Sequence, residues 1–165
     1  MKNKILLLLL LIHTNLIFSQ QYLLPNEYLI YSFETKNGKK MMLAKDKRDN
    51  YIIYRFGTKS KIEFEYPEKN INSWQKLVYS SYMRGGGTQN EGMDLNYVNF
   101  ISNGFQYIIY DTYQAVGNNT EIGLRIINLK TNKKTIIIGL SKTRKGTLTA
   151  LRDNEFIGKS EELFD

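Results

Sequence analysis

The sequence predicts a single all-β domain behind a signal peptide: an antiparallel β-barrel or β-sandwich of about eight to ten short strands in a meander. Two observations carry the prediction of strands. Short runs of alternating or fully apolar residues recur along the chain, and turn residues such as Asn-Gly separate them. A third observation excludes other classes, because no stretch after residue 20 shows the apolar period of a long helix, a linker or a low-complexity tract.

The first 20 residues have the pattern of a secretory signal peptide. Lys2 and Lys4 precede a mainly apolar run at 5–18, and Ser19 supplies a small residue for cleavage. The run is shorter than the ~20 apolar residues that a membrane-spanning helix needs, which disfavours the alternative of an N-terminal anchor. We therefore expect a periplasmic or secreted protein with no stable membrane anchor after cleavage, and one mature domain at 21–165.

The charge of the expected mature chain is moderately positive. The 23 basic residues include the two leader lysines, so 21 basic residues face 16 acidic ones, a net charge of about +5. These basic residues are spread between the expected strands rather than along one face, so we expect no nucleic-acid partner. A cationic surface of this kind favours anionic envelope polymers or acidic proteins.

The mature chain lacks two of the side chains on which much enzyme chemistry depends. It has no cysteine, and His13, the only histidine, lies in the expected leader. Ser-His-Asp and Cys-His nucleophilic catalysis are therefore excluded, and sites for zinc, copper or haem are disfavoured. Paired carboxylates, a Ser-Lys arrangement or a carboxylate-held hard cation stay open, but no cofactor or metal is expected.

The first half of the mature chain predicts an antiparallel meander. Strands are expected at 28–34, 40–45, 51–56 and 61–66. Asn37-Gly38 is a strong signal for a two-residue hairpin turn, and the last of these strands alternates cleanly before Pro67 ends it. Trp74, in the polar connection that follows, is expected to be a partly buried anchor.

The second half continues the sheet with longer strands. They are expected at 76–83, 95–102, 105–110, 122–129 and 134–140, with a short strand near 147–151 and a helical turn around 160–164. Asn103-Gly104 predicts the hairpin turn between two of them. A chain with this many strands must close a barrel or stack two sheets to bury its edges.

The glycine-rich loop at 83–94 is the candidate binding site. Three consecutive glycines let backbone N–H groups approach a ligand, and an adjacent arginine can hold a carboxylate or a phosphate. The candidate residues are Tyr82, Arg84, Gly85, Gly86, Gly87, Asn90, Glu91 and Asp94. No helix start or Gly-Lys-Ser follows, so the loop is not a nucleotide-binding loop, and a plain connection between two sheets is the alternative.

Two further groups of charged residues are candidates for catalysis or for buried ion pairs. Glu91 with Asp94 or Asp111 is the carboxylate pair near the loop that glycan hydrolysis would need. Arg55 and Arg125 interrupt apolar strands and are expected to point outward; if buried, each needs a carboxylate such as Glu34, Glu63, Glu65 or Asp111.

Several short patterns together resemble a group of small exported β-rich proteins of Gram-negative bacteria. They are Asn37-Gly38-Lys39, Tyr54-Arg55-Phe56-Gly57, Glu65-Tyr66-Pro67, Arg84-Gly85-Gly86-Gly87 and Asp94-Leu95-Asn96-Tyr97. The resemblance implies location and fold but no activity. A looser likeness is to periplasmic lysozyme inhibitors, small barrels that usually carry cysteines and a Ser-Gly/Tyr loop, which Ser80-Ser81-Tyr82 matches poorly.

The sequence thus predicts an exported, non-enzymatic envelope protein that binds an envelope protein or a glycan through the 83–94 loop. A carboxylate-dependent peptidoglycan hydrolase, a lysozyme-inhibitor-like protein and a structural envelope component are the alternatives.

Overall fold

The structure, a computed structural model, describes residues 21–164, so the expected signal peptide lies outside the described residues. Two β-sheets face each other, with strand orders β10-β1-β2-β3-β4 and β11-β5-β6-β7-β8-β9. Neither sheet closes on itself. The all-β prediction is therefore confirmed, and of its two alternatives the chain adopts the sandwich.

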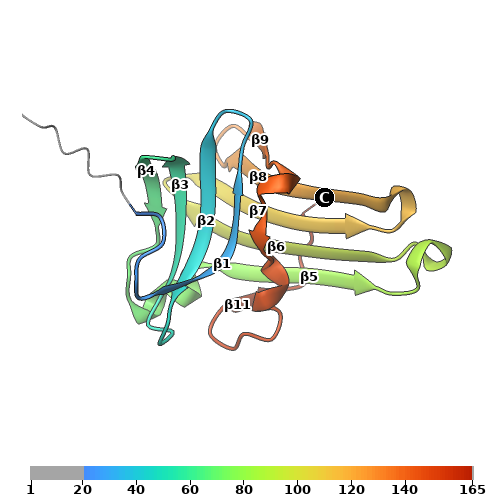
Figure 1. The fold of residues 1–165 in the computed structure, drawn as a ribbon, viewed down its shortest axis with the longest axis horizontal. Helices are drawn as coiled ribbons and strands as arrows, with labels where there is room; N and C mark the ends of the chain where they lie inside the picture. Colours follow the sequence, from blue (N-terminus) through green and yellow to red (C-terminus); the bar gives the residue numbers. More distant parts are fainter. Residues whose placement is uncertain (1–20, 165) are drawn as a thin grey trace, which may run out of the picture.

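The strands agree closely with the expected ones. The first sheet comprises β1 (Glu27–Glu34), β2 (Lys39–Asp46), β3 (Ile52–Thr58), β4 (Lys61–Tyr66) and β10 (Lys145–Gly146). The second comprises β5 (Val78–Arg84), β6 (Met93–Ser102), β7 (Phe105–Gln114), β8 (Asn119–Asn128), β9 (Lys134–Ile138) and β11 (Gly158–Ser160). Adjacent strands are antiparallel except β11 and β5, and the strands of the two sheets cross at a steep angle in Figure 1.

The main core lies between the two sheets. Tyr54 of β3 is fully buried and meets the Phe100 ring of β6 at 5.1 Å between centroids, while Phe100 stacks on Tyr107 of β7 at 4.9 Å. Strand alternation sends these residues inward and their neighbours outward. Trp74, on the 3₁₀ helix η2 (Ile71–Lys76), is buried and donates its indole N–H to Asp49 O at 2.8 Å, so it is an anchor, as expected.

The outer face of the first sheet is covered by the segment 21–26, and this cover explains Arg55. Its guanidinium points outward, as expected, yet it is 1% exposed because the segment lies over it. Arg55 Nη1 donates to Tyr22 O at 2.7 Å, and Nε donates to Glu65 Oε2 at 2.7 Å. Glu65 was among the expected partners, whereas Glu27, which accepts hydrogen bonds from both Nη1 and Nη2 of Arg55, was not.

The segment after β9 contributes one short strand to each of the two sheets. After β9, Gly139 bridges Thr35, the 3₁₀ helix η5 (Ser141–Thr143) follows, and β10 pairs with β1. The 3₁₀ helix η6 (Leu148–Leu151) then leads back to β11, which pairs with β5. The expected strand at 147–151 is wrong, because Thr147 Oγ1 accepts the Thr149 N–H at 3.2 Å and caps a helix.

The expected helical turn at 160–164 is also wrong, since β11 runs to Ser160 and no helix follows it up to residue 164. The β5–β6 and β7–β8 hairpins reach past the first sheet on the right of Figure 1, so their tips have no opposing sheet. Among the described residues no helix has the length and apolarity needed to span a bilayer.

Candidate functional site

The glycine-rich loop forms the tip of the β5–β6 hairpin, so it joins two strands of one sheet rather than two sheets. Gly86 has a φ of 94° and Gly87 of 60°, and the 3₁₀ helix η3 (Gly87–Asn90) follows. A Cβ at Gly86 would lie 2.7 Å from Asn90 Cβ. Asn90 Nδ2 donates to Gly85 O at 2.9 Å, and the Gly92 N–H donates to Gly87 O at 2.7 Å. The glycines are thus required by the backbone conformation of the turn.

Arg84 clamps this loop. Its Nε and Nη2 donate to Glu91 O at 3.0 and 2.8 Å, and Nη2 also reaches Glu91 Oε2 at 3.1 Å. Glu91 itself has a φ of 47°, which places its carbonyl where the guanidinium meets it. Nε and Nη2 of Arg84 are therefore already engaged inside the loop.

The predicted loop residues divide between the two faces of the sheet. Tyr82 pairs with Leu95 and Arg84 with Met93, which places all four on the outer face. Asp94 points to the inner face, where Arg152 Nη2 donates to its Oδ1 at 2.6 Å. The structure therefore brings Tyr82 and Arg84 to one side and places Asp94 on the other.

The carboxylates considered for hydrolysis are each paired with an arginine. Glu91 is held by Arg84, and Asp94 by Arg152. Asp111, on the inner face of β7, accepts from Arg144 Nη1 at 3.0 Å. Within residues 21–164 no cluster of three or more acidic or histidine side chains could hold a metal ion. The arrangement offers charge pairing rather than two free carboxylates facing one substrate.

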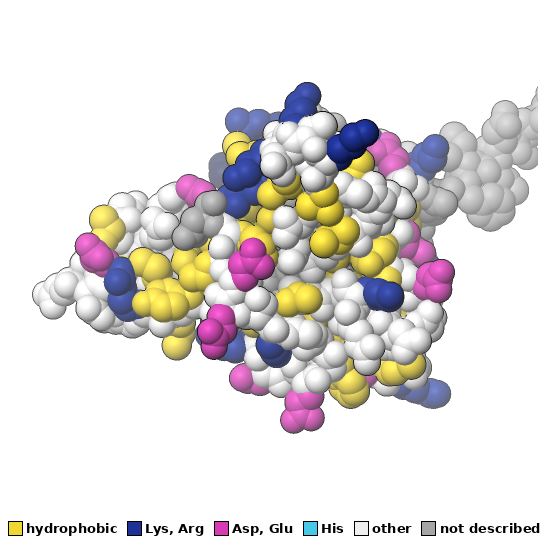
Figure 2. Space-filling view, turned by 180° about the vertical axis from the view of Figure 1, so that it is seen from behind, with side chains coloured by type: hydrophobic (Ala, Val, Ile, Leu, Met, Phe, Trp, Pro, Cys, Tyr) yellow, Lys and Arg dark blue, Asp and Glu magenta, His cyan; other side chains and the backbone are white. Residues whose placement is uncertain are grey.

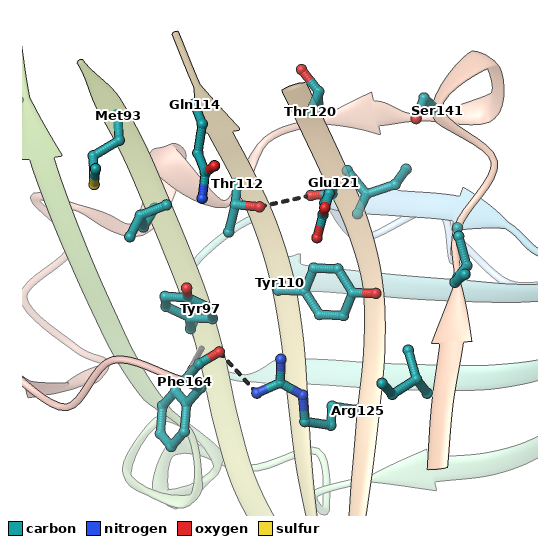
Figure 3. A pocket seen from close by; sticks show the side chains of 15 residues that line it. Met93, Tyr97, Tyr110, Thr112, Gln114, Thr120, Glu121, Arg125, Ser141 and Phe164 are labelled. Atoms are coloured by element: carbon teal, nitrogen blue, oxygen red, sulfur yellow. Dashed lines mark hydrogen bonds between the residues drawn. The ribbon is translucent and has the colours of Figure 1, made fainter. Parts of the chain in front are cut away.

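A groove of about 670 Å³ lies on the outer face of the second sheet, beside the strand ends that carry the loop. Apolar side chains from β6, β7 and β9 and polar ones from β7 and β8 line it (Figure 3). Its main lining residues are Met93, Leu95, Tyr97, Tyr110, Thr112, Gln114, Thr120, Glu121, Arg125, Ile136, Ile138 and Phe164. Met93 and Leu95 are the direct strand partners of Arg84 and Tyr82, so groove and loop share one face.

The floor of the groove depends on Gly123 in the middle of β8. Gly123 lies opposite Tyr110, and a Cβ there would come within 2.3 Å of Tyr110 Oη. The missing side chain lets the phenol ring of Tyr110 lie across β8 (Figure 3). Burial, and then the nearby Glu121 carboxylate, raise the pKa of Tyr110. The ring is therefore a neutral, half-buried platform at ordinary pH.

Phe164 of this same chain occupies the groove. Its ring meets Tyr97 edge-on at 5.7 Å between centroids and an interplanar angle of 72°. Arg125 Nη1 donates to Phe164 O at 2.9 Å (Figure 3). One aromatic side chain and one backbone carbonyl of Phe164 thus occupy part of the groove.

Sequence reasoning missed most of this groove. Arg125 was expected to point outward, which the structure confirms, and its Nη1 donates to the main-chain carbonyl of Phe164. Tyr97, Tyr110 and Phe164 were not singled out. An isolated glycine at 123 between apolar strand residues was the available signal, because such a glycine marks a close approach.

Comparisons of the chain with protein-family models, with curated proteins and with solved structures find no match.

Proposed function

We propose that the protein is an exported, non-enzymatic binding module that captures an extended segment of an envelope protein in the groove on the outer face of its second sheet. The observation that carries the proposal is the seating of Phe164 between Tyr97 and Arg125. The partner we infer is a peptide segment that carries an aromatic side chain.

The chemistry of the groove supports a peptide over other ligands. Tyr97, Tyr110 and Met93 supply apolar surface for an aromatic side chain, whose burial gives the larger part of the binding energy. Arg125 supplies a donor for a main-chain carbonyl. The loop contributes through Tyr82, which is 42% exposed and lies on the same face.

The test uses the segment of the chain that already occupies the groove. A synthetic peptide with the sequence of residues 158–164 is titrated into the wild type and into Phe164→Ala, with isothermal calorimetry as the readout. We expect tighter binding to Phe164→Ala, because the intramolecular competitor is weakened. Adding Arg125→Ala to Phe164→Ala is expected to weaken peptide binding about 10-fold or more.

Matched variants separate the groove from other surfaces. Tyr113→Ala removes a similarly exposed tyrosine that points to the other face of the sheet, and peptide binding is expected to be unchanged. If the peptide binds neither the wild type nor Phe164→Ala, the proposed site is wrong. If Arg84→Ala with Glu91→Ala removes binding while Arg125→Ala does not, the loop rather than the groove is the site.

The other candidate functions receive less support from the geometry. A glycan hydrolase would need two free carboxylates, yet those near the loop are held by arginines, and Glu121 is the one carboxylate among the described lining residues of the groove. Release of sugars from peptidoglycan by the purified protein would favour that function instead. No specific contact favours lysozyme inhibition or a purely structural role. Cell fractionation with N-terminal sequencing tests the export component.

A further inference from the structure

Three separate segments of the chain bring basic residues to one end of the molecule. The β1–β2 turn and the β3–β4 turn lie at the same end of the first sheet, because successive antiparallel strands reverse direction. The crossover through η5 and β10 joins them there, since Leu140 N donates to Glu34 O and Thr143 Oγ1 accepts the Glu34 N–H. We call this end the cationic tip; its basic residues are Lys36, Lys39, Lys40, Lys59, Lys61, Lys142, Arg144 and Lys145.

The cationic tip is only partly neutralised. Lys39 pairs with Glu63, Lys59 with Glu34, and Arg144 with Asp111. The other five lysines of the tip have no carboxylate within ion-pair distance among the described residues: Lys36, Lys40, Lys61, Lys142 and Lys145. Partial burial, and then the positive charge of Lys145, lower the pKa of Lys40, so like charges from different turns act on one another.

The sequence did not reveal this clustering. Basic residues that are scattered along the chain converge because two turns and the crossover meet at one end. Figure 2 shows Lys and Arg side chains gathered at the top of the molecule, the end that carries the β1–β2 turn in Figure 1. Basic side chains that lie close together without acidic partners repel one another, which is unfavourable for the folded state. Their convergence therefore points to an anionic partner.

We propose that the cationic tip docks the protein end-on against a bilayer surface that carries anionic phospholipid headgroups. This docking is separate from peptide capture in the groove and does not depend on it. It would hold the protein at a membrane while the groove, on the outer face of the second sheet, engages its partner.

The composition of the tip favours a lipid surface over nucleic acid or a single bound phosphate. Seven of its eight basic residues are lysines, which act as point charges toward a diffuse anionic surface, whereas specific phosphate sites favour the fork of arginine. The residues 35–40, 58–61 and 141–146 contain no aromatic side chain on which a base could stack.

The experiment measures co-sedimentation of the purified protein with vesicles of phosphatidylcholine alone and of phosphatidylcholine mixed with phosphatidylglycerol. We expect binding to the mixed vesicles that falls as sodium chloride rises from about 0.05 to 0.3 M, because the Debye length shortens. The tip variant is Lys36→Gln with Lys142→Gln and Lys145→Gln, whose side chains are exposed and have no ion-pair partner among the described residues. Its affinity is expected to fall on the order of 100-fold.

The control variant removes the same formal charge at the opposite end of the first sheet: Lys47→Gln with Arg48→Gln and Lys76→Gln. It is expected to bind mixed vesicles within about 3-fold of the wild type, because these residues would face away from the bilayer. Phe164→Ala is likewise expected to leave vesicle binding unchanged, which keeps this test distinct from that of the groove.

Several results would overturn the proposal. Equal binding to vesicles with and without phosphatidylglycerol, or equal losses in the tip and control variants, would remove the tip as a lipid-binding surface. Tighter binding to duplex DNA than to mixed vesicles at equal phosphate concentration would assign the tip to nucleic acid. Salt dependence of the wild type provides a measurement that does not rely on any variant folding.

Discussion

Arg55 and Glu27 form a bidentate ion pair beneath the segment 21–26, with Arg55 Nη1 donating to Glu27 Oε2 at 2.6 Å and Nη2 to Oε1 at 2.7 Å. Both side chains are almost fully buried. Tyr51 Oη adds a donor to Glu27 Oε1 at 3.0 Å. This network fixes the covering segment to the first sheet.

Removing one member of this pair is expected to destabilise the protein strongly. Glu27→Gln leaves the buried Arg55 charge with only the partly exposed Glu65, so the free energy of unfolding is expected to fall by about 3 kcal/mol. Lys39→Gln, which breaks a half-exposed pair with Glu63, is the control and is expected to cost less than about 1 kcal/mol. Urea denaturation measures both, and equal losses would contradict the central role of the buried pair.

Stability is expected to depend on pH through the same network. Burial tends to raise the pKa of Glu27, but the hydrogen bonds from Arg55 and from Leu24 N–H outweigh it and lower the pKa below the ordinary 4.5. Arg55 and Lys69 lower the pKa of Glu65 in the same way, again against its burial. The unfolded state binds these protons first, so the stabilisation is present above pH 4.5 and is lost as pH falls through the lower folded-state values.

The check is a series of urea midpoints from pH 7 down to about 2. The wild type is expected to lose stability on the acid side, and Glu27→Gln is expected to show a flatter curve because one of the linked carboxylates is gone. The same slope in both proteins would show that other groups control acid unfolding.

The packing of Tyr110 over Gly123 is expected to make position 123 intolerant of any side chain. A Cβ there would meet Tyr110 Oη at 2.3 Å and Ile137 O at 2.5 Å, so Gly123→Ala is expected to cost about 1–3 kcal/mol of unfolding free energy. Gly85→Ala is the control, because a Cβ at Gly85 has nothing within 4 Å and its φ is not positive. Thermal denaturation that finds the two variants equally stable would contradict the described floor of the groove.

The clamp of Arg84 on Glu91 is expected to control the hairpin tip and little else. Arg84→Ala removes three hydrogen bonds to Glu91, so exchange of the loop amides at Glu91 and Gly92 is expected to speed up. The global stability is expected to change by less than about 1 kcal/mol, since the contacts are exposed. Gln89→Ala, in the same exposed loop, is expected to leave amide exchange unchanged. Hydrogen exchange followed by mass spectrometry resolves the difference.

Local patterns in the sequence identified the strands well but not what covers them. The strand at 61–66 was predicted with its observed bounds because alternation and Pro67 define it within the segment itself. The direction of Arg55 was also readable, yet its burial depends on residues 21–26, which have no pattern that predicts where they lie. The prediction failed for a different reason at 147–151, where the local threonine cap outweighed β-propensity.

The candidate site shows the same division. The glycine-rich loop was found because its composition is unusual, whereas the groove is assembled from ordinary strand residues that become neighbours only through register, such as Tyr97, Tyr110 and Gly123. Register is determined by the pairing of whole strands, so single residues in the sequence do not reveal which residues will be neighbours across strands.

The return of residues 139–160 from the second sheet to the first and back again has a consequence for the order in which the protein is made. A chain that emerges from its N-terminus completes β1 early, yet the edge of β1 lacks its neighbour until β10 arrives, more than a hundred residues later. In the same way, one edge of β5 has no neighbour until β11 has been made. The pairing of β10 with β1 and of β11 with β5 thus completes the sandwich last. A nascent chain stalled before residue 145 leaves one edge of β1 and one edge of β5 open to chaperones.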